Sequence, residues 1–499
     1  MILEVILKEF TNLNLVKGNP STSIEYIWSD SRKIQKNDLF VLSDEFTDVQ
    51  FMSSAIQNGS NTCLISKSSN LLKIAIEKFD NVLTCNSSAN QMQGKIASLL
   101  LDHPSLKLEV VAVTGTNGKT SLTHILYHFA RSLGIPSGLI GTIHTKFNDT
   151  ILETGYTTPD ASSLQLLLKK MLEDGIKFVF MEASSHGLKL GRTDGIHLRA
   201  ALFTNLTKDH LDFHKTMEDY LLSKFRIFTL LDESNKENKF GIVNLDAEGG
   251  EQVKALIEKN SVQSNIKYLG KNYTYDIAKP EISINGSEFI FKIKKSNSTF
   301  YRNLRIRSIL LGGFNIANVA LALSCWVELN IETEKLTTFT ESIPRIPGRF
   351  DIYYNPDKDR IAIVDYAHTP DALLNILISA KELNPRKLIC LFGCGGDRDK
   401  TKRPEMAEIS ERIADLVVLT SDNPRTEEPE SILDDIEKGF KDKSKIIREI
   451  DRKKAIQVAI SKLQAGDILV VCGKGHENYQ IIGKEKFHFD DGEEIEKAW

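Results

Sequence analysis

One stretch of the chain, residues 108–136, limits most strongly what the protein can fold into. It reads LEVVAVTGTNGKTSLTHILYHFARSLGIP. The apolar, β-branched run at 108–113 predicts a strand that is buried on both faces of a parallel sheet. Apolar residues then recur at helical spacing between residues 122 and 133, until a glycine and a proline end the helix. The stretch therefore predicts a strand, a glycine-containing turn and a helix in succession.

The turn between these elements has the composition of a phosphate-binding loop. Its residues are Thr114, Gly115, Thr116, Asn117, Gly118, Lys119 and Thr120. Glycines let backbone N–H groups close around phosphate oxygens, while the helix N-terminus and the lysine add positive potential. The threonine hydroxyl is suited to Mg²⁺. The alternative is a glycine turn that only precedes a helix, but the flanking strand and helix favour a nucleotide site.

Length and composition indicate the class of protein. A chain of 499 residues exceeds one ordinary core, so about two to four domains are expected. Hydrophobic residues make up 41% and charged residues 26%, as in soluble globular proteins. A net charge of −4 gives no electrostatic reason to expect nucleic acid. The longest apolar region, at 309–329, contains two glycines and two asparagines, so we expect no membrane span.

The six cysteines are scattered and lack C-x-x-C spacing. They are typical of reduced residues in a cytoplasmic protein, and they offer no zinc site. We therefore expect a cytoplasmic location.

Two further strands in the middle third, at 176–181 and 198–203, end in polar side chains. Glu182 follows the first strand, and the second leads towards His210. Open α/β sheets bind ligands at the carboxyl ends of their strands. We therefore expect Glu182 and His210 to approach the phosphate loop from neighbouring strands, where oxygen or imidazole ligands could hold Mg²⁺. A plain loop explains His210 equally well.

A helix that opens at Thr216 carries Lys224 on an apolar face with Tyr220 and Phe228. One interpretation is a snorkelling lysine whose stem covers apolar surface. The other is a desolvated amine that is partly neutral and can be modified. From the residues alone, the snorkelling interpretation is favoured.

The remaining chain predicts antiparallel strands and then a second α/β unit. Residues 265–310 alternate polar and apolar, which indicates antiparallel strands. Beyond a boundary near 342–347, apolar strands are expected at 361–364, 387–392, 415–419 and 467–471. Each strand ends in a polar cluster, and these clusters should form one ligand site. They contain Asp365 and His368; Asp397 and Arg398; Asp422, Asn423 and Arg425; and Lys474, His476 and Glu477.

In order, the motifs TGTNGKT, MEASSHGL, TNLTKDHLDFH, GRF, VDYAHTPDAL, FGCGGDRDKTKRPEM, SDNPR and GKGHENYQ resemble the signature of the Mur ligases. They are most similar to the branch that adds the third residue of the peptidoglycan stem peptide. The resemblance implies an α/β protein of three domains. These are a UDP-binding domain at 1–105, a central ATPase domain with a P-loop-type parallel sheet at 106–343, and a C-terminal Rossmann-like domain at 344–499.

The resemblance also implies an activity and its substrates. Such enzymes use ATP and Mg²⁺ to phosphorylate a carboxylate of UDP-N-acetylmuramoyl-L-Ala-D-Glu, and an amine then attacks the acyl phosphate. Among amino acids, the DNPR motif is associated with meso-diaminopimelate rather than L-lysine. The expected protein is a monomer without nucleic-acid or membrane partners. The rivals are folylpolyglutamate synthase, which shares the phosphate loop, and a nucleotide-gated switch without an amino-acid pocket.

Site residues follow from the motif positions. Lys119, Lys224 and His210 would be catalytic, Lys224 as a carbamylated lysine. Thr120, Glu182, His210 and Lys224 would hold metal, and Asn315, Arg349 and Asp365 would join residues 115–120 around ATP. The muramoyl dipeptide would meet Ser31, Thr157, Thr158, Ser184 and Arg192. Diaminopimelate would meet Arg398, Asp422, Asn423, Pro424, Arg425, Gly473 and Glu477.

Arg425 is the expected discriminator between the two amino acids. Its planar fork of donors suits the extra carboxylate of diaminopimelate. The alternative is a structural ion pair between Arg425 and the nearby Glu427 or Glu428.

Overall fold

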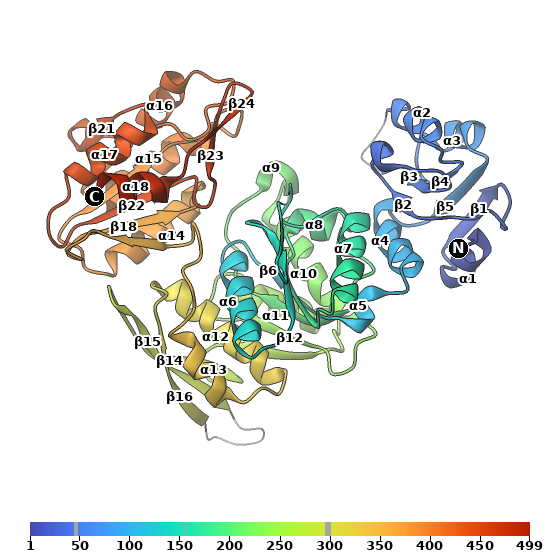
Figure 1. Ribbon diagram of the computed structural model, residues 1–499, viewed down its shortest axis with the longest axis horizontal. Coiled ribbons are helices and arrows are strands. Elements are labelled where there is room, and N and C mark those ends of the chain that lie inside the picture. Colours follow the sequence, from blue (N-terminus) through green and yellow to red (C-terminus); the bar gives the residue numbers. More distant parts are fainter. Residues whose placement is uncertain (44–47, 154, 295–300) are drawn as a thin grey trace. The chain divides into compact units, whose positions relative to one another are not determined.

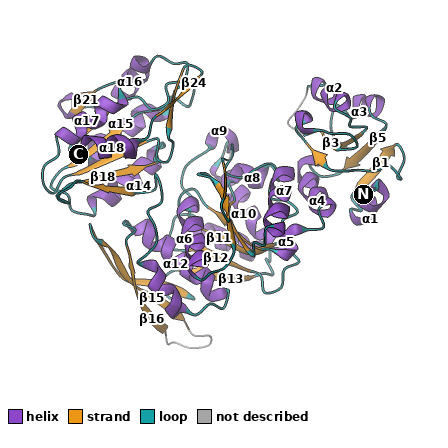
Figure 2. Ribbon diagram, in the orientation of Figure 1, coloured by secondary structure: helices purple, strands orange, loops and turns teal. Residues whose placement is uncertain are grey.

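The computed structural model describes residues 1–43, 48–153, 155–294 and 301–499 (Figure 1). The chain divides into two compact units. The first unit contains Met1–Leu206 and His210–Leu269, and the second contains Thr207–Asp209 and Gly270–Trp499. Both mix helices and strands (Figure 2). Within the described residues, no helix is long and apolar enough to cross a membrane.

The first unit begins with a sheet of strand order β1-β5-β4-β3-β2. Its elements are α1 (Leu3–Glu9), β1 (Leu13–Lys17), β2 (Ile27–Trp28), η1 (Ser31–Lys33), β3 (Leu39–Val41), α2 (Gln50–Gln57), β4 (Thr62–Ser66), α3 (Leu72–Lys78), β5 (Asn81–Cys85) and α4 (Ala89–Leu100). Both faces are buried, since Leu39 and Val41 belong to one apolar cluster and Phe40 to another. Alternate residues of a strand point to opposite faces, so a strand covered on both sides needs a continuous apolar run.

The same unit contains a second sheet, in which the order β13-β12-β11-β6-β10-β7-β8-β9 places β6 in the middle. Its elements are α5 (Pro104–Lys107), β6 (Glu109–Thr114), α6 (Lys119–Ser132), β7 (Ser137–Ile140), β8 (Thr145–Phe147), β9 (Thr150–Leu152), α7 (Ala161–Glu173), β10 (Phe178–Glu182), α8 (Ser185–Lys189), β11 (Leu198–Phe203), α9 (Leu211–His214), α10 (Met217–Glu233), β12 (Phe240–Asn244), α11 (Gly250–Lys259) and β13 (Asn265–Leu269). This confirms the predicted order of strand, turn and helix around residue 115.

The register of the central strands brings their functional ends together. Strands β10 and β11 lie parallel to β6, one on each side. Glu182 pairs with Val113, and Phe203 pairs with Thr114. All three strands therefore end beside the phosphate loop, as the sequence predicted.

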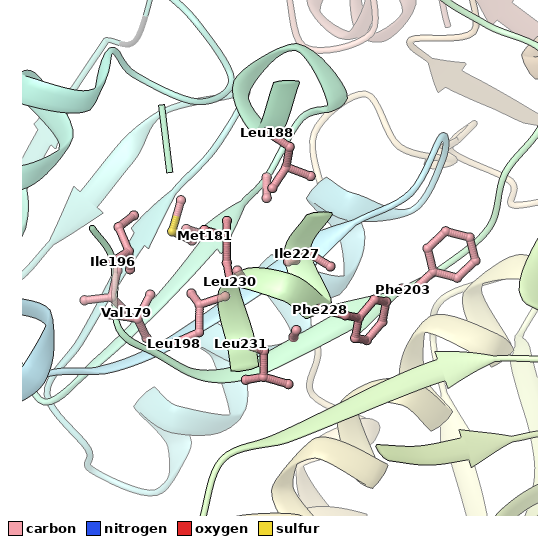
Figure 3. Packing of buried hydrophobic residues seen from close by; sticks show 14 of the residues in the cluster. Val179, Met181, Leu188, Ile196, Leu198, Phe203, Ile227, Phe228, Leu230 and Leu231 are labelled. Carbon is pink, nitrogen blue, oxygen red and sulfur yellow. The ribbon is translucent and has the colours of Figure 1, made fainter. Parts of the chain in front are cut away.

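Helix α10 is held against this sheet by a large apolar cluster. Figure 3 shows Ile227, Phe228, Leu230 and Leu231 of the helix beside Val179, Met181, Leu198 and Phe203 of the strands. Burying side chains of this size stabilises by about 1.5–3 kcal/mol each. The packing fixes the rotation of α10, so the Lys224 side chain has a defined direction.

The second unit starts with the antiparallel strands β14 (Tyr275–Ser283), β15 (Gly286–Lys294) and β16 (Tyr301–Ser308), followed by α12 (Gly313–Glu328) and α13 (Thr333–Thr340). The prediction of antiparallel strands over 265–310 is wrong for β13, which pairs parallel with β12. The physical reason is that α11 connects the two strands, and a helical crossover leaves successive strands parallel.

The last sheet has the order β17-β18-β22-β19-β20-β21. The elements from residue 351 onward are β17 (Asp351–Tyr354), β18 (Ile361–Asp365), α14 (Pro370–Lys381), β19 (Leu388–Phe392), α15 (Lys402–Ile413), β20 (Leu416–Leu419), α16 (Pro429–Glu437), η2 (Lys443–Lys445), β21 (Ile446–Arg448), α17 (Arg452–Ser461), β22 (Ile468–Cys472), β23 (Tyr479–Ile482), β24 (Glu485–His488) and α18 (Asp491–Ala498). Strands β23 and β24 form a separate two-stranded sheet. The four predicted strands are confirmed as β18, β19, β20 and β22, and they are parallel to one another. Their carboxyl ends therefore share one edge of the sheet.

Candidate active site

The phosphate loop is clamped by the residues that follow β11. Thr204 Oγ1 donates to the carbonyl oxygen of Asn117 at 2.6 Å, and the backbone N–H of Asn117 donates to Asn205 Oδ1 at 2.9 Å. Gly115 has a φ of 152°, and a Cβ at this position would collide with Thr204 Oγ1. Glycine is needed here because the Thr204 side chain occupies the space of a Cβ.

Lys119 is the first residue of α6, and its ammonium group lies over the loop. Its Nζ donates to the carbonyl oxygens of Gly115 at 2.9 Å and Thr116 at 2.8 Å. A cation beside a helix N-terminus favours an anion with several negative oxygens. The geometry supports the predicted role of Lys119 at a nucleotide phosphate.

Glu182 is buried at the end of β10 and is surrounded by donors. Its carboxylate accepts from Thr120 Oγ1 at 3.0 Å, and from the N–H and hydroxyl of Thr142 at 2.8 and 3.0 Å. Thr142 was missed from the sequence, although it follows β7 and the rule that ligands bind at strand ends could have found it. Thr120 and Thr142 thus hold the Glu182 carboxylate in a fixed position through three donors.

Thr120 and Glu182 fit the Mg²⁺ expected for this site. Mg²⁺ is bound in proteins by one or two carboxylates together with waters and substrate phosphates, not by a full protein cage. A carboxylate and a hydroxyl at the mouth of a phosphate loop supply that donor set. Within the described residues, no group of three or more histidine, cysteine, aspartate or glutamate side chains could hold a metal ion.

Lys224 is buried and also contacts the phosphate loop. Its Nζ donates to the carbonyl oxygen of Gly115 at 2.6 Å and lies 4.4 Å from the centroid of the Tyr220 ring. Tyr220 in turn donates to Thr116 Oγ1 at 3.2 Å. The snorkelling interpretation is therefore wrong, because the amine lies against the loop instead of in water.

His210 belongs to a group of histidines next to Tyr220. Its ring is 4.8 Å from that of His186 and 6.1 Å from that of Tyr220. His214 was not predicted as a site residue from the sequence. Its Nε2 forms a hydrogen bond of 2.9 Å with Ser185 Oγ. Burial lowers the pKa of His214, so a neutral imidazole is favoured there.

The predicted substrate residues of the first unit fall into two places. Thr158 Oγ1 is 3.1 Å from Ser184 Oγ, and Arg192 donates to the Thr158 carbonyl at 3.0 Å. Thr157 Oγ1 is 3.1 Å from Thr142 Oγ1, so it borders the Glu182 group. Ser31 is buried in η1, where its carbonyl accepts from Asn58. Three hydroxyl residues and Arg192 thus lie near the end of β10, whereas Ser31 lies in η1 between β2 and β3.

A second group of charged residues lies at the carboxyl edge of the last sheet. Asn423 Nδ2 donates to Glu477 Oε2 at 2.8 Å, and Lys474 Nζ is 3.4 Å from the same oxygen. Burial lowers the pKa of Lys474, although Asp422 and Glu477 oppose that shift. The β23–β24 hairpin supports the group, because Ile481 N donates to Asn423 Oδ1 at 2.9 Å. The contact between this hairpin and Asn423 was not predicted from the sequence.

Arg425 is fixed by backbone oxygens. Its Nη1 donates to the carbonyls of Gly396 at 2.9 Å and Asn423 at 3.4 Å. Glu427 forms its ion pairs with Arg403 and Lys400, so the predicted alternative of an Arg425–Glu427 pair is wrong. Among the described residues, Arg425 forms no ion pair with Glu428 either. The Arg425 guanidinium therefore keeps donors for a carboxylate.

Three residues predicted to contact ATP lie in the second unit, namely Asp365, Arg349 and Asn315. Asp365 accepts from the N–H groups of Phe350 at 2.8 Å and Ala367 at 2.9 Å, and its burial raises its pKa. The Arg349 guanidinium stacks 4.9 Å from the Tyr366 ring. Asn315 is buried at the start of α12 and donates to the Leu311 carbonyl at 2.8 Å.

Four further predicted site residues follow strands of the last sheet, namely His368, Arg398, Pro424 and Gly473. His368 follows β18, and its Nδ1 lies 2.9 Å from the Tyr366 carbonyl. Arg398 is exposed and donates to the Asp397 carbonyl at 3.1 Å. Pro424 is buried and directly precedes Arg425, whose φ is 51°. Gly473 has a φ of 113° and lies against Asp422 Oδ2.

Comparisons with known proteins agree with this arrangement. Residues 113–326 match the Mur ligase middle domain, and residues 348–475 match the Mur ligase, glutamate ligase domain. A protein of Leptospira interrogans named UDP-N-acetylmuramoyl-L-alanyl-D-glutamate–2,6-diaminopimelate ligase is 49% identical, with 99% of this chain and 97% of that protein covered. The chain belongs to the Mur ligase family. A Bacillus cereus Mur ligase of the same name is 38% identical over 97% of this chain and 95% of its own length.

Solved structures show the same Mur ligase fold. One titled as UDP-N-acetylmuramoyl-L-alanyl-D-glutamate–2,6-diaminopimelate ligase has a TM-score of 0.69 and 31% identity, covering 97% of this chain and 96% of that chain. Folylpolyglutamate synthase of Mycobacterium tuberculosis has a TM-score of 0.61 at 16% identity, covering 77% and 92%. At that identity the second likeness concerns the fold alone.

The Gly115 geometry yields a first prediction. Gly115→Ala should weaken ATP binding by about tenfold or more, because the new methyl group collides with Thr204 and displaces the loop. Gly134→Ala is the matched control, since Gly134 also has a positive φ, of 71°, but no atom near its missing Cβ. ATP affinity is measured by calorimetry. Equal affinities for the two variants would contradict the prediction.

Proposed function

We propose that this Mur ligase joins meso-diaminopimelate to UDP-N-acetylmuramoyl-L-Ala-D-Glu, with ATP as co-substrate and Mg²⁺ as cofactor. The observation that carries the proposal is the group at the carboxyl edge of the last sheet. Asp422 and Glu477 are suited to ammonium groups, and Arg425 is suited to a carboxylate. A diamino dicarboxylic acid presents both kinds of charge. The names of the relatives described above support the same substrates.

The first unit would activate the D-glutamate carboxylate. A carboxylate is a poor acyl donor because its leaving group would be oxide, and transfer of the ATP γ-phosphate makes phosphate the leaving group instead. Lys119 would neutralise charge on the transferred phosphoryl group, since its ammonium already lies over the loop. Mg²⁺, held by Thr120 and Glu182, would withdraw electron density from phosphate oxygens when bound.

The incoming amine would then attack the acyl carbon, form the amide bond and release phosphate, with the amine proton passing to a base. Asp422 and Glu477 would orient the ammonium groups of the amino acid. Thr157, Thr158, Ser184 and Arg192 would hold the muramoyl dipeptide, with Ser31 in the N-terminal UDP-binding domain.

We further propose that the chain acts as a cytoplasmic monomer with domains at 1–105, 106–343 and 344–499. All six cysteines are free thiols, which supports a reducing compartment. Asn315, Arg349 and Asp365 would complete the ATP contacts.

One assay tests the proposed reaction. ADP release should require UDP-N-acetylmuramoyl-L-Ala-D-Glu and a diamino acid together, and Lys119→Ala should abolish it at saturating ATP. Folylpolyglutamate synthase activity would instead require a folate and glutamate. ADP release without any amino acid would indicate a nucleotide switch. Either result would replace the proposal.

A second prediction concerns Lys224, which we propose is carbamylated and catalytic. Lys224→Ala should lower turnover by about a hundredfold or more, because a carbamate at this buried position would stabilise a cation beside the loop. Formate or acetate should partly restore turnover by supplying a carboxylate. Tyr127, which is on α6 and away from these contacts, gives the control Tyr127→Phe. Full activity of Lys224→Ala would show that the amine is structural only.

A third prediction concerns the choice of amino acid. Wild-type protein should prefer meso-diaminopimelate over L-lysine in kcat/KM by about a hundredfold or more, since lysine leaves the Arg425 guanidinium without its anion. Arg425→Ala should reduce that ratio mainly by losing activity with diaminopimelate. The control is Arg448→Ala, which removes an arginine whose ion pairs are with Asp434, Glu437 and Glu430. An unchanged ratio in Arg425→Ala would remove Arg425 as the discriminator.

A further inference from the structure

A fully buried ion pair joins two helices that pack against the last sheet. Arg452 is the first residue of α17, and Asp491 is the first residue of α18. Arg452 Nε lies 2.7 Å from Asp491 Oδ1, and Nη2 lies 2.8 Å from Oδ2. Both side chains have an exposed fraction of 0%. Taking two charges out of water costs several kcal/mol per ion in real proteins, so such a pair calls for a physical explanation.

The remaining donors of Arg452 reach the backbone at two strand ends. Nη2 donates to the Cys472 carbonyl at 2.9 Å, and Nη1 donates to the Ser421 carbonyl at 3.3 Å. Cys472 ends β22, and Ser421 lies just beyond β20. These strands are not neighbours, because β19 lies between them in the sheet. One guanidinium therefore connects two segments that no ladder hydrogen bond joins directly.

Each of these carbonyls immediately precedes a residue of the proposed amino-acid pocket. Asp422 follows Ser421, and Gly473 follows Cys472. The two pocket residues are in close contact, since a Cβ on Gly473 would collide with Asp422 Oδ2. A small change in the separation of the two strand ends would therefore displace the Asp422 carboxylate.

Arginine has the donor geometry that this arrangement needs. Its planar fork binds a carboxylate through two parallel N–H groups and still has donors for both carbonyls. Lysine keeps the charge but has no rigid fork, so it cannot hold three acceptors at fixed directions.

We propose that Arg452, held by Asp491, is a positioning residue of the amino-acid pocket. It fixes the separation of the β20 and β22 ends and thereby the place of Asp422 relative to Gly473. This inference rests on the proposed function, because it takes Asp422 and Gly473 as the residues that meet the incoming amino acid. The C-terminal helix α18 is then part of the substrate-binding apparatus through one side chain.

The chain provides a comparison pair at the opposite edge of the same sheet, where the arginine side chain is half exposed. Arg386 binds Asp467 in the same bidentate way, at 3.0 and 2.9 Å, and Asp467 directly precedes β22. Arg452→Lys and Asp491→Asn are therefore compared with Arg386→Lys. The full-length variants are assayed for KM with each substrate, for kcat and for thermal midpoint.

The expected result is a selective change in one constant. Arg452→Lys and Asp491→Asn should raise KM for diaminopimelate by about tenfold, while KM for ATP and for the muramoyl dipeptide changes by less than about twofold. Arg386→Lys should lower the thermal midpoint without raising KM for diaminopimelate. A purely structural role would lower the midpoint of all three variants and leave every KM unchanged.

Failure of the inference and failure of the proposed function give different results. Wild-type protein that accepts no diamino acid would overturn both. Active wild-type protein with unchanged KM for diaminopimelate in both variants would overturn the inference alone. If Arg452→Lys and Asp491→Asn both fail to fold, the ion pair is a stability element and the inference is equally overturned.

Discussion

The carbonyl oxygen of Gly115 is the point at which two helices of the first unit contact the phosphate loop. It accepts hydrogen bonds from Lys119 at the start of α6 and from Lys224 in the middle of α10. Each lysine is held there by its helix, because α6 and α10 both bury an apolar face. The Lys119 ammonium therefore supplies positive charge for a nucleotide phosphate at the loop, and the proposed carbamate on Lys224 would lie beside the same loop.

Much of this framework could be predicted because it depends on local patterns. The strand, loop and helix around Gly115 follow from apolar periodicity and glycine placement within one short stretch. Glu182 could be placed beside the loop because parallel strands end at one edge of a sheet. The direction of β13 could not be predicted from its own residues, because antiparallel strands show the same alternation of polar and apolar residues. Its connection through α11 decides that it pairs parallel with β12.

Contacts between side chains distant in sequence were beyond prediction for a different reason. Whether Lys224 reaches water or the loop depends on the rotation of α10, and that rotation is set by the whole cluster in Figure 3. The pairing of Arg452 with Asp491 is likewise invisible in sequence, because neither residue stands in a motif with known spacing. The role proposed for Lys224 comes from the family resemblance, because its local pattern did not predict it.

The phosphate loop and the proposed amino-acid pocket share one structural feature. In each, a glycine with positive φ at a strand end lies against a side-chain oxygen, that of Thr204 at Gly115 and that of Asp422 at Gly473. Absence of a Cβ lets the backbone approach within contact distance of a polar group. An alanine at either position would introduce backbone strain and displace the oxygen in one step. The proposed function would therefore depend on how closely the strand ends approach one another, and the buried charges of Arg452 and Glu182 lie at those ends.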